Sequence, residues 1–327
     1  AYFVESRRVV FVDFTGSKIV DYIFNKNYDT DEIVDKIQNL EKKDVLGFVS
    51  DLEKFLEEEQ ESYPIPKDGF FSVPLSAEVQ VNNVCNLRCR HCFQSDYSKT
   101  QSLQQIEKTL KIFNQKNVFM INLVGGEIFL HPDALDIIKM AFDKYLFSTN
   151  IVTNATLIND EIIKSLSAIQ NKPAFLISLE GIGKYNDEIR GNGVFEKVTK
   201  VIDKLVKNGF YVEISCTLNS SNIKNYEQLI KFAKQKNIPC NFNLFKPFKS
   251  SQSDLTLTPK EYFEFISKIQ EHQKKGLQVG VTNAAIEGLS SGKERDVCRA
   301  AVSGLTIDVD GYLLPCALLY EAGYYKK

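Results

Sequence analysis

From about Ser76 onward, short runs of apolar residues alternate with longer segments in which apolar residues recur at helical spacing. The short runs predict buried strands, and the three- and four-residue spacing predicts amphipathic helices. Strands are expected at 77–84, 118–124, 147–153, 174–180, 211–218 and 241–246. Helices are expected between them, at 102–115, 131–145, 160–169, 195–209 and 225–236. This alternation is typical of an α/β fold, with a parallel sheet covered by helices.

The strand and helix units are fewer than the eight that close a full barrel, so we expect a partial (β/α)6 barrel over residues 78–257. Residues 258–327 begin with another helical pattern. Two β-rich arms then surround Asp310 and Gly311, which predicts a β-hairpin.

Residues 1–66 follow a different pattern. A β-rich run, RRVVFVDF, precedes three helical segments, and the last of them places Val45, Phe48 and Phe55 along one face. We interpret this order as a winged-helix-like domain. Prolines, a glycine and small polar residues follow it, and they predict a linker at 67–77.

Composition narrows the possible partners. The 327 residues include 40 basic and 42 acidic side chains, for a formal net charge of −2, which gives no electrostatic reason to expect a nucleic acid or a membrane surface. No apolar run has the length of a membrane span, and the first residues lack the order of a signal peptide. We therefore expect a cytoplasmic protein. In that compartment, seven cysteines indicate metal or redox chemistry rather than disulfides.

Three of the cysteines form the motif CNLRCRHC, at Cys85, Cys89 and Cys92. A tetrahedral zinc site needs a fourth ligand, and His91 is poorly suited because neighbouring side chains rarely reach the same ion. A 4Fe-4S cluster is the other solution. Its three thiolates would bind three irons and leave the fourth iron open to a ligand that is not protein.

The motif resembles the signature of radical S-adenosylmethionine (SAM) enzymes. Three further segments resemble that family, namely LVGGEIFLHPD, IVTNATLI and ISLEGIGKYNDEIRGNGVFEKV. The resemblance implies a partial barrel, a 4Fe-4S cluster on Cys85, Cys89 and Cys92, and SAM bound to the open iron. Reduction of the cluster would then cleave SAM and release a 5′-deoxyadenosyl radical, which would abstract a hydrogen atom from the substrate.

The same resemblance implies roles for other residues. Gly125 and Gly126 lack a Cβ and would let backbone approach SAM, while Glu127 would accept a hydrogen bond from its ammonium group. Arg190 would meet the SAM carboxylate, and His91 would lie beside the adenine. Ser178 and Glu180 would lie near the ribose or methionine part of SAM, and Asn154 is also expected to bind the cofactor.

Each assignment has a structural alternative. The two glycines could simply form a turn after a strand, and Arg190 could belong to a surface ion pair. Ser178 and Glu180 could be ordinary strand-end residues. We assign no chemistry to His131, and we interpret Cys216 and Cys240 as small buried residues.

A second pair of cysteines lies near the end of the chain. The pair consists of Cys298 and of Cys316, which follows Gly311 with four residues between them. This spacing resembles the opening of SPASM or twitch extensions, which carry auxiliary iron-sulfur clusters. Two thiolates are too few for such a cluster, so we expect this region to be incomplete at Lys327. The alternative is two unrelated cysteines that flank a hairpin.

The order of elements in residues 1–66 resembles the recognition element of enzymes that modify ribosomally synthesised and post-translationally modified peptides (RiPPs). Such elements bind the leader segment of a precursor peptide by strand addition. DNA is the other ligand of winged helices, and the acidic segment EKFLEEEQE disfavours it.

Together these resemblances predict a sactisynthase-like RiPP maturase that receives electrons from an external donor such as flavodoxin or ferredoxin. We expect a thioether crosslink as its product, with a carbon-carbon bond as the alternative. A second hypothesis keeps the radical chemistry but gives it a protein side chain or a small molecule, as in sulfatase maturation or cofactor biosynthesis. A third hypothesis is a DNA-binding regulator that senses oxygen or iron through its cluster.

Overall fold

The computed structural model describes most of the chain: residues 2–3, 8–9, 19, 28–37, 41–57, 74–145, 147–169, 172–247, 250–281, 304–321 and 323. The chain divides into two compact units, Ala1–Ser72 and Val73–Lys327. The predicted linker at 67–77 lies largely outside the described residues and stays a prediction.

In the first unit, strand β1 (Tyr2–Phe3) pairs antiparallel with strand β2 (Arg8–Val9), which lies in the predicted β-rich run. Helices α2 (Thr30–Lys36) and α3 (Lys42–Glu57) follow. Helix α2 begins at a capping box, in which the Asp29 side chain accepts from the Glu32 N–H and the Glu32 side chain accepts from the Asp29 N–H. Buried Ile33 and Val45 join the two helices. The winged-helix interpretation stays a prediction.

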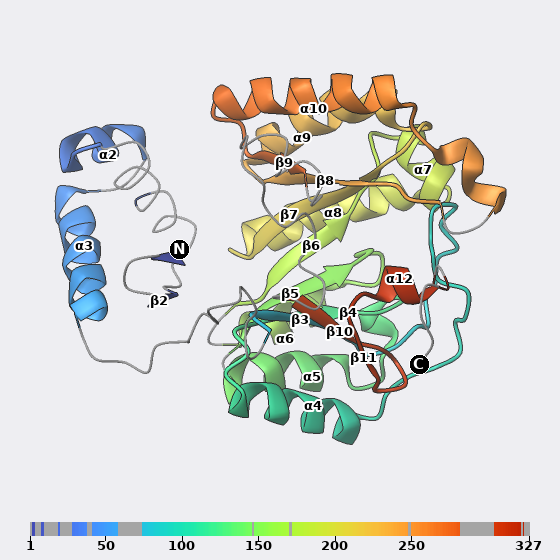
Figure 1. The fold of residues 1–327 in the computed structure, drawn as a ribbon, viewed down its shortest axis with the longest axis horizontal. Coiled ribbons are helices and arrows are strands. Elements are labelled where there is room, and N and C mark those ends of the chain that lie inside the picture. Colours follow the sequence, from blue (N-terminus) through green and yellow to red (C-terminus); the bar gives the residue numbers. More distant parts are fainter. Residues whose placement is uncertain are drawn as a thin grey trace. The chain divides into compact units, whose positions relative to one another are not determined.

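The second unit contains a nine-stranded sheet in the order β11-β10-β3-β4-β5-β6-β7-β8-β9 (Figure 1). Every neighbouring pair is parallel except β10 and β11, which are antiparallel. The strands are β3 (Ser76–Gln80), β4 (Met120–Val124), β5 (Ser148–Thr153), β6 (Ala174–Ser178), β7 (Tyr211–Leu218), β8 (Cys240–Leu244), β9 (Val279–Val281), β10 (Gly304–Ile307) and β11 (Leu313–Leu314).

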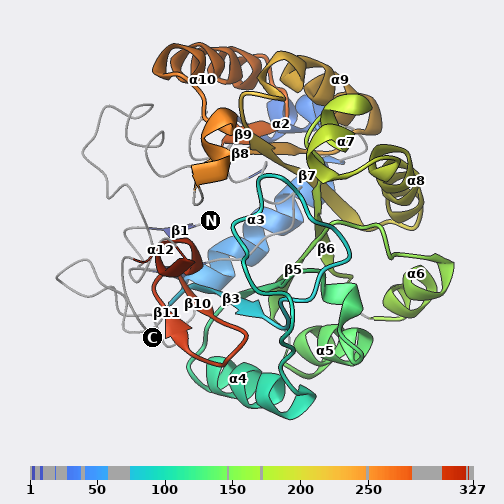
Figure 2. The same cartoon turned by 90° about the vertical axis from the view of Figure 1, so that its right-hand side faces the viewer.

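The strands follow a curved arc, and helices α4, α5, α6, α8, α9 and α10 lie along its outer side (Figure 2). The α-helices are α4 (Leu103–Gln115), α5 (Ala134–Lys139), α6 (Asp160–Ser167), α7 (Lys184–Arg190), α8 (Val194–Lys207), α9 (Tyr226–Lys236), α10 (Pro259–Lys274) and α12 (Ala317–Glu321). The shorter helical segments are η1 (Ile128–Leu130), η3 (Ile223–Asn225) and η4 (Ser250–Leu255), all 3₁₀, and the π-helical η2 (Met140–Lys144). This arrangement confirms the predicted α/β partial barrel.

Side chains alternate across the sheet, as the period of a strand requires. On one face, apolar residues such as Val79, Ile121 and Phe175 are completely buried in the main hydrophobic core. The other face is polar in its middle, where the Asn150 Nδ2 donates to the Asn122 Oδ1 at 2.9 Å. The large core therefore lies between sheet and helices, and it holds the strand ends in place.

Strands β10 and β11 pair antiparallel where the sequence predicted a C-terminal β-hairpin. That the hairpin belongs to a cluster-binding extension stays a prediction. Strand β10 adds to the barrel sheet beside β3, with Thr306 opposite Glu78. The Gln101 Nε2 donates to the carbonyl oxygens of Gln80 and Asp308, both at 2.9 Å, and so ties the hairpin to β3. Without β10, strand β3 would lie at the edge of the sheet. The parallel pairing gives hydrogen-bond partners to the backbone N–H and C=O groups on that side of β3.

Candidate active site

The sequence-predicted residues come together at the carboxyl ends of parallel strands, where barrel folds place their chemistry. The loop after β3 carries Cys85, Cys89 and Cys92, all half-buried and free of disulfides. The Cys92 N–H donates to the Cys89 carbonyl oxygen at 3.0 Å, which turns the loop tightly. In the described part of the chain, no three His, Cys, Asp or Glu side chains converge on one metal ion. A 4Fe-4S cluster would use the three thiols differently, with one thiolate on each of three irons.

The two glycines after β4 lie against the backbone that leads into the cysteine loop. The Gly126 N–H donates to the Asn82 carbonyl oxygen at 3.0 Å, and the Glu127 N–H donates to the Val84 carbonyl oxygen at 2.8 Å. A Cβ on Gly126 would lie 2.3 Å from the Val84 carbonyl oxygen. The structure thus gives these glycines a packing role within the protein, and their approach to SAM stays a prediction.

Glu127 is 1% exposed, and its carboxylate joins the loops after β4 and β5. It accepts hydrogen bonds from the Phe129 N–H at 3.2 Å, the Thr153 hydroxyl at 2.6 Å and the Asn154 N–H at 2.8 Å. Burial raises the pKa of Glu127, while these three donors act in the opposite direction. The carboxylate is therefore a structural acceptor in this arrangement, and its contact with the SAM ammonium group stays a prediction.

Asn154 connects β5 to the cysteine loop. Its Nδ2 donates to the Asn86 Oδ1 at 3.0 Å and lies 3.8 Å from the Cys85 Sγ. Its Oδ1 accepts from the Thr156 N–H and hydroxyl, and the Thr156 hydroxyl accepts in turn from the Asn86 Nδ2 at 2.8 Å. This closed polar network fixes the position of the loop around Cys85. The sequence analysis missed Asn86 and Thr156.

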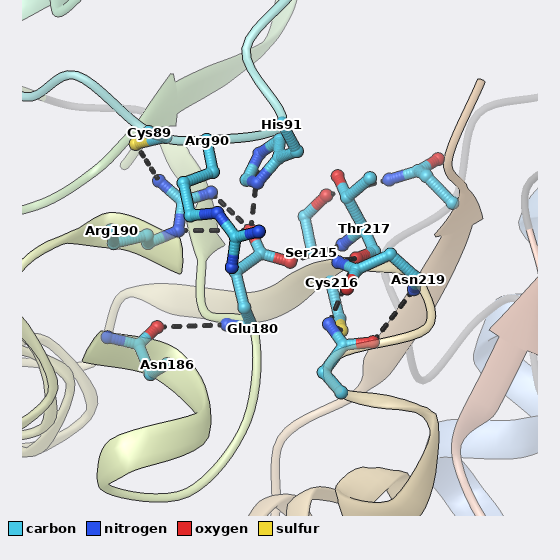
Figure 3. Close-up of polar contacts among 12 residues, drawn as sticks. Cys89, Arg90, His91, Glu180, Asn186, Arg190, Ser215, Cys216, Thr217 and Asn219 are labelled. Atoms are coloured by element: carbon cyan, nitrogen blue, oxygen red, sulfur yellow. Dashed lines mark hydrogen bonds and ion pairs between the residues drawn. The ribbon is translucent and has the colours of Figure 1, made fainter. Parts of the chain in front are cut away.

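Glu180 and Arg190 form a buried ion pair beside the cysteine loop (Figure 3). The Arg190 Nε and Nη2 both donate to the Glu180 Oε1, and the Thr217 N–H donates to the Glu180 Oε2 at 2.7 Å. The third guanidinium nitrogen, Nη1, lies 3.8 Å from the Cys89 Sγ. Arg190 is 8% exposed, so it is not a surface residue. Ser178, the last residue of β6, lies opposite Ser215 of β7.

His91 points toward Glu180, with its Nε2 3.7 Å from the Glu180 Oε1 (Figure 3). Its Nδ1 is buried and has no hydrogen-bond partner among the described residues. Burial lowers the pKa of His91 to about 4, so the ring is neutral near pH 7. A buried polar atom without a partner is costly, which fits a site that is completed by a bound molecule.

A cavity of about 290 Å³ opens beside Cys89 and Cys92. Helix η4 forms one wall of this cavity. It is held against the cysteine loop by the Gln252 Nε2, which donates to the carbonyl oxygens of Arg90 and Cys92, both at 3.0 Å. Burial raises the pKa of the Cys89 thiol to about 11, although the Arg190 charge acts to lower it. Three thiols, a cavity and a nearby cation are suited to an anionic metal cluster.

The sequence also singled out four other cysteines and His131. Cys298 lies outside the described residues, and Cys316 is a half-buried residue just before α12. Cys216 and Cys240 are buried, as predicted. His131 is buried, with its Nε2 2.8 Å from the Gln101 carbonyl oxygen, so its role is structural.

The sequence profile of the Radical SAM superfamily matches residues 79–243. The chain belongs to this superfamily. Its cofactors are accordingly a 4Fe-4S cluster and SAM, and the cysteine loop, the glycine pair and the Glu180–Arg190 pair all lie inside the matched region. In the described part of the chain, no helix is long and apolar enough to cross a membrane.

Several curated relatives of this radical SAM protein are similar over part of their length. The antilisterial bacteriocin subtilosin biosynthesis protein AlbA of Bacillus subtilis is 30% identical over 158 residues, 47% of this chain and 35% of AlbA. The sporulation killing factor maturation protein SkfB of the same species is 25% identical over 262 residues, 75% of this chain and 61% of SkfB. The mycofactocin maturase MftC of Mycobacterium tuberculosis is 25% identical, over 56% of this chain and 49% of MftC. The chain thus spans between a third and three fifths of these relatives.

Solved structures show the same fold. Streptococcus suis SuiB bound to precursor peptide SuiA superimposes with a TM-score of 0.67 and 16% identity, over 97% of this chain and 80% of SuiB. The anSMEcpe structure with bound AdoMet gives a TM-score of 0.62 and 20% identity, over 75% of this chain and 72% of that one. At these identities, the likeness supports the architecture of the radical SAM barrel.

Proposed function

We propose that this protein is a radical SAM maturase that modifies a ribosomally synthesised precursor peptide. The observation that carries the proposal is the meeting of the cysteine loop, the glycine pair and the Glu180–Arg190 pair at one edge of the barrel. The relatives AlbA, SkfB and MftC, named for the biosynthesis or maturation of peptide products, support the choice of a peptide as substrate.

In this proposal Cys85, Cys89 and Cys92 hold the cluster through their thiolates. Once bound, the reduced cluster would supply one electron to SAM, whose cleavage would give methionine and the 5′-deoxyadenosyl radical that takes a hydrogen atom from the substrate. Asn154 and Arg190 keep the Cys85 and Cys89 side chains in place. Neutral His91 offers its unpaired Nδ1 to the bound SAM beside the adenine.

The remaining SAM contacts are part of the same proposal. Gly125 and Gly126 would bring backbone close to SAM, and Glu127, whose carboxylate also anchors its own loop, would accept a hydrogen bond from the SAM ammonium group. Ser178, at the end of β6, and Glu180, two residues later, would lie near the ribose or methionine part of SAM.

A thioether crosslink is the product we favour. One hydrogen atom leaves the substrate carbon in 5′-deoxyadenosine, the cysteine thiol of the substrate loses its proton, and the new carbon-sulfur bond releases one electron. We assign the acceptor of that electron to an auxiliary iron-sulfur cluster to which Cys298 and Cys316 contribute. A peptide that is crosslinked once should therefore be lighter by two hydrogen atoms.

We assign to residues 1–66 the binding of the leader segment of the precursor peptide. The leader would add as a strand beside the strand that contains Arg8 and Val9. A flavodoxin or ferredoxin supplies the electron that starts each turnover, in the cytoplasm.

Co-expression with the short open reading frames that neighbour the gene tests this function. Mass spectrometry should detect a peptide that has lost two hydrogen atoms, and this product should disappear with Cys89→Ala. Deletion of residues 1–66 should abolish modification of the peptide, while cleavage of SAM to 5′-deoxyadenosine continues. If the deletion leaves modification of the peptide unchanged, leader binding by this unit is wrong. If no neighbouring peptide changes mass, the alternative substrates, a protein side chain or a small molecule, are favoured.

A further inference from the structure

A buried chain of charges ends on one sulfur atom of the cysteine loop. The Glu180 carboxylate is 1% exposed, the Arg190 guanidinium contacts it through two nitrogens, and the third nitrogen lies 3.8 Å from the Cys89 Sγ (Figure 3). The Cys85 Sγ lies closest to the neutral Asn154 amide and Leu87 N–H, and the charge of the exposed Arg88 acts on it only weakly. The cation is thus directed at one of the three thiols.

The geometry fixes the direction of this charge pair. The Thr217 N–H holds the Glu180 Oε2, and the Asn186 Oδ1 accepts from the Glu180 N–H at 3.0 Å, so the carboxylate is anchored on the β6 and β7 side. The guanidinium is therefore the end of the pair that faces Cys89. Both side chains are buried, so solvent and salt screen their field weakly.

The charge on Arg190 is permanent under any working condition. The guanidinium forms a buried ion pair with the Glu180 carboxylate. A guanidinium also cannot be deprotonated in proteins at accessible pH.

We propose that Arg190, held in place by Glu180, raises the reduction potential of the cluster through the sulfur of Cys89. The inference rests on the proposed ligand role of Cys89. Reduction adds one negative charge to the cluster and its thiolates, and a fixed cation beside one thiolate stabilises that added charge. Hydrogen bonds and net charge around the sulfurs are known determinants of iron-sulfur potentials. In this account Arg190 is a positioning and tuning residue whose effect does not require contact with SAM.

A redox titration in the absence of SAM tests the proposal. The protein is reconstituted anaerobically with iron and sulfide, and the reduced cluster is followed by electron paramagnetic resonance against applied potential. Arg190→Gln removes the cation and should shift the midpoint to a more negative potential. Glu180→Gln removes the opposing negative charge and should shift the midpoint in the positive direction. Arg190→Lys keeps the positive charge but loses the planar guanidinium that contacts Glu180 and Cys89 at once. The negative shift of its midpoint potential should therefore be smaller than that of Arg190→Gln.

Arg90→Gln is the matched control. Arg90 is adjacent to Cys89 in sequence, but it is exposed and paired with exposed Asp254, so its removal should shift the midpoint less than Arg190→Gln does. The opposite signs for Arg190→Gln and Glu180→Gln distinguish tuning from general damage to the site. If Arg190→Gln does not retain a cluster, Arg190→Lys and Glu180→Gln still carry opposite predictions. Wild-type midpoints in all loaded variants, or shifts of one sign, would overturn the proposal. A wild-type protein that takes up no cluster would refute the proposed function instead.

Discussion

At Gly126, a single methyl group is enough to disturb the cysteine loop. In Gly126→Ala the new Cβ would lie 2.3 Å from the Val84 carbonyl oxygen and 2.5 Å from that of Asn83, and backbone atoms cannot rotate away. We expect the free energy of unfolding to fall by about 1–3 kcal/mol and the iron content after reconstitution to fall with it. Chemical denaturation and iron analysis measure both.

The control for this substitution is Gly47→Ala in helix α3, where no atom lies within 4 Å of the added Cβ. It should be neutral or stabilising by about 0.5–1 kcal/mol, because alanine favours a helix. Gly126→Ala with wild-type stability and iron content would show that the glycine is not needed for packing.

Cys89 should react slowly with alkylating reagents in metal-free protein. Burial raises its pKa to about 11, so the thiolate, which is the reactive form, is scarce at neutral pH. Because the pKa is raised, the alkylation rate should climb by about tenfold per pH unit from pH 7.5 to 9.5. Peptide mapping after iodoacetamide treatment measures this rate. In denatured protein the same thiol should level off at lower pH, and identical profiles in the two states would contradict the prediction.

Individual ligands and their supports differ in how well the sequence predicts them. The three thiols are close in sequence, so spacing alone predicts that they lie on one loop, as they do. The partners of Glu127 and Arg190 could not, because they are Thr153, Asn154 and Glu180, which reach them only after the strands have paired. Asn82 and Asn83 stand directly before the cysteine loop. Because polar residues at a strand end often anchor neighbouring loops, the sequence could have predicted that these two hold the loop in place.

Among the elements, the C-terminal hairpin is tied to β3 in part by the buried side chain of Gln101. Gln101 is 2% exposed, and its amide joins β3 to the turn after β10. Gln101→Ala leaves two carbonyl groups without this donor, and we expect a loss of about 1–3 kcal/mol in the free energy of unfolding. Gln104→Ala, at an exposed position of helix α4, should stay within about 0.5 kcal/mol of wild type. Equal stabilities of the two variants would contradict this role.

Helix η4 should protect the cysteine loop. Gln252 is 4% exposed and donates to two carbonyl oxygens of that loop. Losing both hydrogen bonds should cost about 1–2 kcal/mol and make local opening of the loop about tenfold more frequent. In Gln252→Ala, the visible absorbance of the reconstituted cluster should therefore bleach faster in air. Ser253→Ala, an exposed neighbour in the same helix, is the control and should bleach at the wild-type rate.

Strand positions could be predicted because their apolar runs are bounded by polar loops. Strand β7 matches its predicted range, and the other barrel strands differ by a few residues at their ends. Helix α7 was missed because KYNDEIR contains little apolar periodicity. The segment 131–145 was expected to be one helix, but it contains α5 and the π-helical η2. The pairing of β10 with β3 is a long-range contact, which a local pattern does not encode.

The whole molecule consists of two compact units, a partial barrel and an N-terminal unit with its own small core. The barrel and its superfamily follow from motifs inside residues 79–243. The peptide substrate depends on the N-terminal unit and on the region around Cys298 and Cys316, where short or sparse motifs give the sequence less predictive power.

The most direct test of the account is the formation of 5′-deoxyadenosine by anaerobically reconstituted protein with SAM and dithionite. The wild-type protein should produce it, and Cys89→Ala should not. Cys240→Ala, which changes a cysteine buried in strand β8, should retain both iron and activity. Chromatography with mass spectrometry measures the nucleoside. Formation by Cys89→Ala at the wild-type rate, or no formation by an iron-loaded wild-type protein, would contradict the assignment of radical SAM chemistry to this site.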